Sequence, residues 1–205
     1  MKNLTLILLF CASIPCFSQM DSKGLFSLGV RNTYGFFETT KGVSTGVGGN
    51  FRIQLSDRIN TEWYADYIFN SFEYFSRKDY HIGWSVLYYF LPEPGMFQPY
   101  IEGGHCFDLS KMSVYEGHTV SADTEMGTRF SSAVQLGLGT HLNITDRFDI
   151  TLKTQYMLHL GKELHAHTHQ HGDQTHVEIE EGHGAGLEGH LLGTISLNYK
   201  IGNLW

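Results

Sequence analysis

The sequence predicts an all-β protein, an eight-stranded antiparallel up-and-down transmembrane β-barrel with short periplasmic turns and long extracellular loops. Three observations lead to this fold class. Apolar and polar residues alternate in eight separate runs of about ten residues, the length that a tilted strand needs to cross a bilayer. The connections between these runs are alternately short and long. The chain also begins with a short apolar segment that is typical of exported proteins.

The first 18 residues have the layout of a secretory signal peptide. Lys2 supplies a positive charge, an apolar run follows, and small residues precede a cleavage point after Ser18. Residues 19–205 then form the barrel domain. A lipoprotein signal with Cys16 as the lipidated residue is the alternative, and Pro15 disfavours it because a small residue is expected there.

In each run, one set of alternate residues is apolar and the other is polar or small. The apolar sets of the first four runs are Phe26, Leu28 and Val30; Val47, Phe51 and Ile53; Trp63, Ala65, Tyr67 and Phe69; and Ile82, Trp84, Val86, Tyr88 and Phe90. Those of the last four are Ile101 and Phe107; Val134, Leu136, Leu138 and Leu142; Phe148, Ile150, Leu152, Tyr156 and Leu158; and Ile195, Leu197, Tyr199 and Ile201. Since side chains of a strand project to opposite faces in turn, we expect the apolar sets to face lipid and the others to face the lumen.

The connections support the same fold. Residues 56–58, 91–95 and 145–147 form short turns, whereas long loops are expected at about 34–43, 70–79, 107–128 and 161–188. Outer-membrane barrels have short periplasmic turns and longer extracellular loops. An even number of strands then leaves both termini in the periplasm.

A soluble eight-stranded barrel is the alternative, and the charged residues argue against it. They fall on the polar face, which a soluble barrel would turn outward. In a membrane barrel they instead form a lumen charge network with paired opposite charges, for which we expect Arg31, Arg52, Glu62, Asp66, Glu102 and Lys153, with Asp149 and Lys200 on the same face. An eight-stranded barrel is just wide enough for side chains to fill it. The sequence therefore predicts a plugged barrel, with a narrow small-solute channel as an alternative.

Composition narrows the function classes. The net charge of −7 argues against nucleic-acid binding, which needs a basic surface. Only Cys106 lies outside the signal peptide, so an intrachain disulfide is not expected.

Three segments resemble the OmpA/OmpX-like outer-membrane β-barrel family, the small porin-like group. They are Gln98–Gly104, Gln135–Leu142 with the turn and strand that follow, and the terminal strand Gly193–Trp205. The resemblance implies an outer-membrane location, contact with outer-membrane lipid and lipopolysaccharide, and recognition by the barrel-assembly machinery through the C-terminal strand that ends at Trp205. It does not fix the function, because members of the family differ in what they do.

The longest expected loop contains a histidine-rich segment. The candidate metal ligands are His165, His167, His169, His171, Asp173, His176 and His183. Four of these histidines alternate, so in an extended segment they share one face and neighbouring imidazoles can share a metal. Imidazole with carboxylate suits Zn, Cu or Ni. The intervening glycines favour a mobile loop, which suits adaptable capture of a metal more than a rigid structural site, and a surface loop that binds metal only incidentally is the alternative.

The remaining histidines and the serines give little support to an enzyme. We expect His81, His105, His141 and His159 to be lumen or rim residues. No compact His-x-Ser arrangement faces lipid, and the pairs His118–Ser121 and His81–Ser85 have spacings that do not suit a catalytic pair. The sequence thus favours a monomeric structural or surface-interaction protein that requires no cofactor, with a lipid A deacylase or acyltransferase as the alternative.

Overall fold

The computed structural model describes residues 23–37, 42–115, 126–161, 164–171, 174–181 and 186–205. The signal peptide expected at residues 1–18 lies outside this set. Within it there are ten strands: β1 (Leu25–Phe37), β2 (Ser44–Gln54), β3 (Ile59–Ser71), β4 (Phe75–Tyr89), β5 (Phe97–Val114), β6 (Met126–Asn143), β7 (Phe148–Gly161), β8 (Leu164–His171), β9 (Gln174–Glu181) and β10 (Gly186–Asn203). The described residues contain no helix long and apolar enough to cross a membrane.

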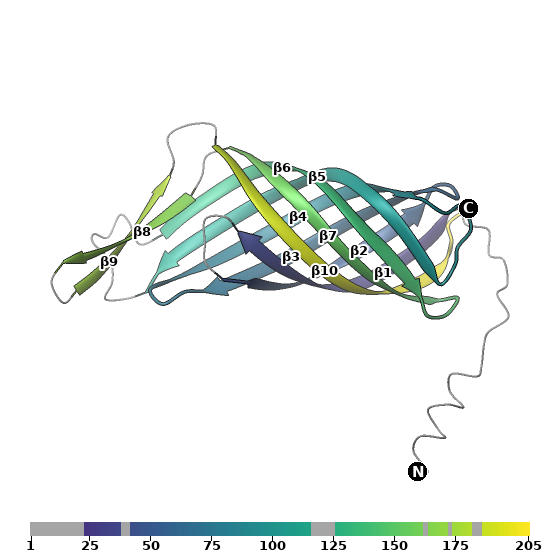
Figure 1. Cartoon of the computed structure of the whole chain (residues 1–205), viewed down its shortest axis with the longest axis horizontal. Helices are drawn as coiled ribbons and strands as arrows, with labels where there is room; N and C mark the ends of the chain where they lie inside the picture. Colours follow the sequence, from purple (N-terminus) through teal and green to yellow (C-terminus); the bar gives the residue numbers. More distant parts are fainter. Residues whose placement is uncertain (1–22, 38–41, 116–125, 162–163, 172–173, 182–185) are drawn as a thin grey trace, which may run out of the picture.

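Eight of the strands form a closed antiparallel barrel in the order β1-β10-β7-β6-β5-β4-β3-β2, which confirms the predicted fold class (Figure 1). Closure is achieved by β1 and β10, the two ends of the sheet, which pair from Leu25↔Asn203 to Phe37↔His190. Each barrel strand therefore has two neighbours, and no edge is left unpaired in the barrel. β8 and β9 form a separate two-stranded sheet at the end of the barrel opposite the C-terminus.

The barrel is apolar outside and charged inside, as the alternation predicts. Val30, Ile82 and Leu136 are 66%, 64% and 62% exposed, whereas Arg31 and Glu62 are 3% and 1% exposed. A soluble barrel has the opposite arrangement, because it must present polar groups to water. The fold is therefore that of a membrane-spanning barrel.

Strands extend further than the sequence analysis expected, so the long loops were predicted too wide. β1 continues to Phe37, β5 to Val114, and β6 begins at Met126, inside the expected loops 34–43 and 107–128. The expected loop 70–79 is wrong for most of its length, since β3 ends at Ser71 and β4 begins at Phe75. Polar residues occupy both faces near these strand ends, for example Arg77 inside and Lys78 beside it, so the alternation that marks a strand is lost there.

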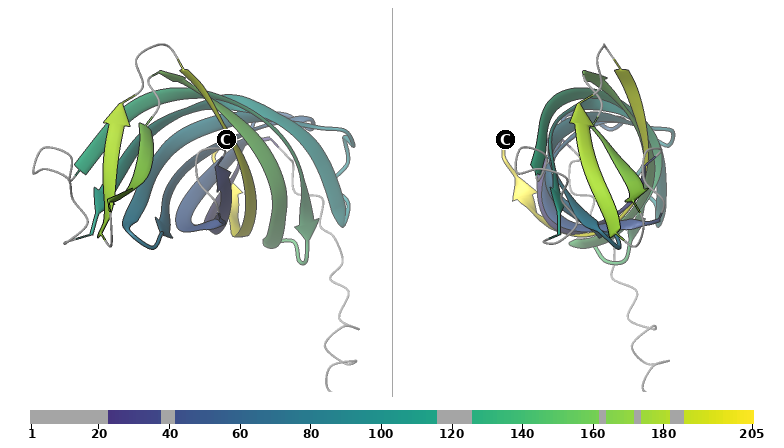
Figure 2. Two further views of the ribbon diagram at one scale, coloured as in Figure 1. Left: turned by 60° about the vertical axis from the view of Figure 1, so that its left-hand side comes forward. Right: turned by 90° about the vertical axis from the view of Figure 1, so that its left-hand side faces the viewer.

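The expected loop 161–188 is also corrected. Its residues 164–171 and 174–181 form the β8–β9 hairpin, and β10 begins at Gly186. Figure 2 shows this hairpin at the mouth of the barrel, seen along the barrel in its right-hand view. The glycines that favoured a mobile loop lie outside the two strands of the hairpin, so they do not interrupt its ladder.

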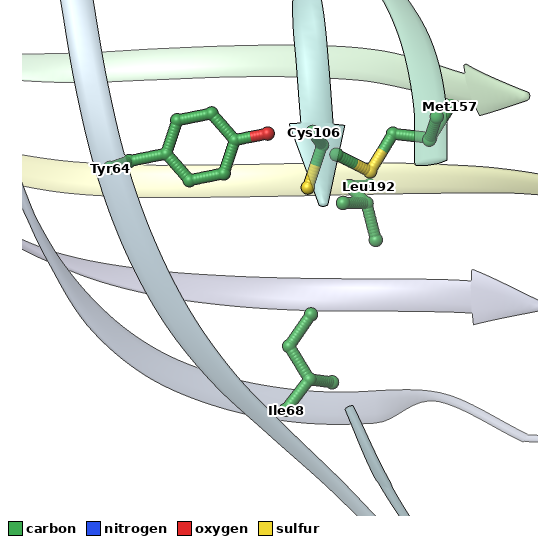
Figure 3. Packing of buried hydrophobic residues seen from close by; sticks show 6 residues of the cluster. Tyr64, Ile68, Cys106, Met157 and Leu192 are labelled. Carbon is green, nitrogen blue, oxygen red and sulfur yellow. The ribbon is translucent and has the colours of Figure 1, made fainter. Parts of the chain in front are cut away.

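A layer of apolar side chains crosses the lumen at mid-height. Tyr64, Ile68, Cys106, Met157 and Leu192 converge from four different strands of the barrel, together with Ala133 (Figure 3). Along β7, Met157 lies between Gln155 and His159, so the layer separates polar residues on either side of it. The lumen is divided into two polar compartments, one toward the chain termini and one toward the β8–β9 hairpin.

Candidate functional site

The compartment near the termini, which we call the terminal compartment, contains the charges named from the sequence. Arg31 forms ion pairs with Glu62 (Nη1–Oε1, 3.3 Å) and Asp66 (Nε–Oδ1, 3.0 Å). Lys153 lies between two carboxylates, 2.6 Å from Glu62 and 3.2 Å from Glu102. All five side chains are at most 1% exposed. Such charges can be buried because each has an opposite partner.

Arg52 is held apart from this group, and pairs with a residue that the sequence analysis placed on the same face. Its Nη2 lies 2.6 Å from Asp149 Oδ2, and its Nη1 lies within 3.0 Å of both ring nitrogens of His141. These contacts join β2 to β6 and β7 across the lumen. With Lys200, the terminal compartment holds four basic and four acidic side chains among the described residues.

The compartment near the hairpin, which we call the loop-side compartment, was missed by the sequence analysis. Arg77 pairs with Asp79 at 3.0 Å and with Glu188 at 3.2 Å. Arg129 pairs with Asp108 at 3.1 Å and also with Glu188. These residues fall within or beside the segments taken for loops, although each continues the inward phase of its strand: Arg77 and Asp79 lie on the same face of β4 as His81. Continuing the alternation of inward and outward positions beyond the apolar stretch of each strand would have identified these lumen residues.

Three of the four separate histidines lie in the lumen. His81 and His159 are buried in the loop-side compartment, and His141 is buried in the terminal compartment. The expectation that His105 is a lumen or rim residue is wrong. It occupies the outward phase of β5, and its Nε2 lies 2.6 Å from Ser132 Oγ on β6.

This outward His105–Ser132 pair resembles part of a catalytic arrangement, so its surroundings matter. The ring of Phe107 packs edge-on against His105 with centroids 4.7 Å apart. Among the residues that the structure describes, no carboxylate contacts the imidazole, so the third group that orients a catalytic histidine is missing. His81 and Ser85, the pair considered from the sequence, do not contact each other. His81 faces Asp108, whereas Ser85 Oγ accepts a hydrogen bond from Gln135.

The β8–β9 hairpin carries the histidine-rich segment on a regular ladder. In the antiparallel register, His165 is opposite Glu180, His167 opposite Glu178, and His169 opposite His176. Directly opposite positions share a face of a sheet, and so do alternate positions along a strand. Five histidine positions and two glutamate positions therefore fall on one face of the hairpin. Of the other candidate ligands, His171 is opposite Gln174, while Asp173 and His183 lie outside the described residues.

The other face of the hairpin combines the apolar residues Leu164, Ala166, Val177 and Ile179 with the polar residues Thr168, Gln170, Thr175 and Glu181, and Val177 is fully buried. The hairpin lies against β6 of the barrel. The histidine and glutamate positions thus lie on the face opposite Val177.

Comparison with known proteins places the chain by fold. No protein-family model matches the sequence, and no curated protein matches it. Solved structures with a similar fold include Ail, the attachment invasion locus protein of Yersinia pestis (TM-score 0.52, 12% identity, covering 89% of this chain and 100% of Ail). Neisserial surface protein A gives a TM-score of 0.52 at 15% identity, covering 86% of this chain and 97% of that one. A major outer membrane protein from Thermus thermophilus gives 0.56 at 7% identity, covering 86% and 99%. The predicted resemblance to small OmpA/OmpX-like barrels is confirmed as a likeness of fold.

Proposed function

We propose that this protein is an integral outer-membrane β-barrel that captures divalent transition metal ions at the cell surface with its β8–β9 hairpin. The barrel supplies a rigid, plugged support, and the hairpin supplies the chemistry. The observation that carries the proposal is the register of the hairpin, which gathers five histidine and two glutamate positions on one face.

The membrane location follows from the outer surface of the barrel. Its exposed residues are large and apolar on every barrel strand, and its charges are buried in the lumen. The C-terminus and the start of β1 lie at one end of the barrel and the hairpin lies at the other. Because the termini of such barrels are periplasmic, this arrangement supports an extracellular position for the hairpin.

The hairpin suits capture of Zn, Cu or Ni. Positions directly opposite in an antiparallel pair have Cβ atoms about 4.5–5.5 Å apart, close enough for two side chains to share an ion. The pair formed by His169 and His176 meets this condition, and His165 and His167 each have a glutamate opposite. Imidazole and carboxylate groups together favour these metals over Ca²⁺ or Mg²⁺, which prefer oxygen ligands alone.

Calorimetry on the folded full-length protein tests the proposal. Zn²⁺, Cu²⁺ and Ni²⁺ are each titrated into the protein and into a variant in which the five hairpin histidines are replaced by glutamine. We expect the variant to lose the binding of metal ions by the hairpin and to keep the barrel fold. Replacing Gln170 and Thr168, which occupy the opposite face, with alanine serves as the control and leaves binding intact. Unchanged binding by the five-histidine variant would contradict the proposal.

Protonation gives a second readout. Histidine binds metal as the neutral imidazole, and its ordinary pKa is about 6.5. Capture by the hairpin is therefore expected to weaken as the pH falls through this range. Affinity that stays constant from about pH 7.5 to about pH 5 would point to ligands other than histidine.

Two other functions have less support. Among the described residues, the candidate pair for a lipid A deacylase or acyltransferase is the outward His105–Ser132, which no described carboxylate contacts. His118 and Ser121 lie outside the described residues. Mass spectrometry of lipid A from expressing cells tests this, and a mass shift that Ser132→Ala abolishes would establish the enzyme. A channel would need a continuous lumen, but Tyr64 on β3 reaches across to Gln135 on β6 with a 2.5 Å hydrogen bond.

A further inference from the structure

A second group of metal-ligand side chains lies inside the barrel, well away from the hairpin sequence. His81 on β4, Asp108 on β5 and His159 on β7 converge in the loop-side compartment, and one ligand atom from each lies within 4.8 Å of the other two. The three residues are 0%, 0% and 1% exposed. Three strands that are not all neighbours thus deliver two imidazoles and one carboxylate to a single enclosed point.

Several polar atoms of this group lack a well-aligned hydrogen bond. Both ring nitrogens of His81, Oδ1 of Asp108 and Nε2 of His159 are buried without a hydrogen-bond partner. A neutral imidazole has one donor and one acceptor, and leaving such groups unsatisfied inside a protein is destabilising. By contrast, the outer atoms of the group are held: Asp108 Oδ2 accepts from Ser110 and Arg129, and His159 Nδ1 lies 3.0 Å from Ser131 Oγ. Of the atoms without a well-aligned hydrogen bond, His81 Nε2 and Asp108 Oδ1 face each other at 3.3 Å.

The charge balance also leaves room for a cation. Among the described residues, the loop-side compartment holds three carboxylates, Asp79, Asp108 and Glu188, against two guanidinium groups, Arg77 and Arg129. The imidazoles of His81, His159 and His190 lie among these carboxylates. A cation, either a proton on one of these imidazoles or a bound metal ion, balances the remaining negative charge, which would be costly in a low-dielectric interior. The terminal compartment has four charges of each sign.

The spacing fits a transition metal. His81 Nε2 lies 3.3 Å from Asp108 Oδ1. Two ligands that each bond to a tetrahedral zinc at about 2.0–2.1 Å are themselves about 3.3–3.4 Å apart. His159 Nδ1 lies 3.4 Å from Asp108 Oδ2. Ser131 contacts His159 and Arg129 donates to Asp108, as outer groups do at metal sites.

We infer that His81, Asp108 and His159 form an internal binding site for a divalent transition metal of the Zn²⁺ or Co²⁺ type. Three protein ligands leave a fourth position open, which is typical of sites whose metal can exchange or take another ligand. This site uses none of the hairpin residues, so it does not rest on the proposed hairpin function. The apolar layer of Tyr64, Cys106, Met157 and Leu192 lies between this site and most of the terminal compartment. Asp66, the partner of Arg31, is directly opposite His81 in the register of β3 and β4.

Cobalt spectroscopy separates the two sites. The five-histidine hairpin variant in full-length form is purified in detergent, and Co²⁺ is supplied either to the folded protein or during refolding. We expect one bound Co²⁺ with the intense visible absorption of tetrahedral coordination. In this background, Asp108→Asn or His159→Gln should weaken binding by more than about 100-fold, because even outer-shell changes at metal sites cost about 10–100-fold. His141→Gln removes a buried histidine of the other compartment and should leave binding unchanged.

Several outcomes would overturn the inference. The hairpin variant could bind no Co²⁺ under either loading condition, or bind it equally well after Asp108→Asn. The difference between heated and unheated samples on a gel reports whether each variant is folded, and His81→Asn gives an independent ligand change if His159→Gln does not fold. If the wild type and the hairpin variant both bind a single ion, the internal site stands and the hairpin proposal fails. If only the wild type binds, the reverse holds.

Discussion

Lys153 on β7 and Glu62 on β3 form an ion pair across the interior of the barrel, with 2.6 Å between Nζ and Oε1. The two strands are not neighbours in the sheet, so this contact ties opposite walls of the barrel together. Glu62 also accepts hydrogen bonds from Arg31 and Asn50. The Glu62 carboxylate thus balances two buried cations and links β3 to three other strands, β1, β2 and β7.

Replacing Glu62 with glutamine is expected to destabilise the folded barrel strongly. The substitution keeps the shape but leaves Arg31 and Lys153 short of a negative charge, and breaking a buried pair in this way costs about 3–5 kcal/mol. The free energy of unfolding, measured by urea titration in lipid vesicles, checks this. Glu93→Gln in the exposed turn between β4 and β5 is the control and should change stability by less than about 0.5 kcal/mol. Equal effects at the two positions would mean that the lumen pairs contribute no stability.

Gly104→Ala is expected to destabilise the barrel, because β5 lies too close to its neighbour at this point. A Cβ atom on Gly104 would lie 2.7 Å from Ser85 Cα, and backbone cannot move aside as a side chain can. Overpacking of this kind costs about 1–3 kcal/mol. Gly193→Ala provides the matched comparison, since a Cβ there meets nothing within 4 Å. The same unfolding titration distinguishes the two, and a stable Gly104→Ala barrel would refute the proposed steric limit.

Leu136→Arg should impair insertion in a manner that depends on depth in the membrane. Leu136 is 62% exposed on the outer face of β6, and an arginine at the middle of a bilayer costs about 2–4 kcal/mol in barrels of this kind. Thr128→Arg lies on the same face of β6 near the hairpin end and should cost about 0–1 kcal/mol. Folding into vesicles, followed by tryptophan fluorescence, measures both. A similar cost at both positions would argue against a membrane boundary between them.

Deletion of Trp205 should reduce assembly in cells more than stability in vitro. The terminal aromatic is expected to be recognised by the assembly machinery, whereas in the fold its indole lies over Gly24, which the neighbouring Leu204 already binds through its N–H. The amount of folded protein in outer-membrane fractions is compared with the refolding yield in vesicles. Trp205→Phe keeps an aromatic end and should restore assembly. Equal losses in cells and in vitro would assign Trp205 a purely structural role.

The sequence by itself determined the barrel, because alternation is a local property. A strand with apolar and polar faces has only one arrangement in a bilayer, and the outward phase expected for segments such as 63–69 and 82–90 is the phase found. Inward placement of Arg31, Glu62 and Lys153 follows from the same periodicity. Apolar and polar residues no longer alternate near the strand ends on the hairpin side, so Arg77, Asp108 and Arg129 were not recognised as lumen residues.

Tertiary structure alone decided which of these side chains meet. His81, Asp108 and His159 are far apart in the sequence, and only barrel closure, strand register and tilt bring them within 4.8 Å. The outward contact of His105 with Ser132 likewise depends on the β5–β6 register. In the hairpin, the sequence showed that four histidines alternate, but the pairing of β8 with β9 placed His176, Glu178 and Glu180 on the same face. Periodicity fixes the face that a residue occupies, whereas its neighbours across the sheet and the lumen are set by hydrogen-bonded register, which is not a local property of the chain.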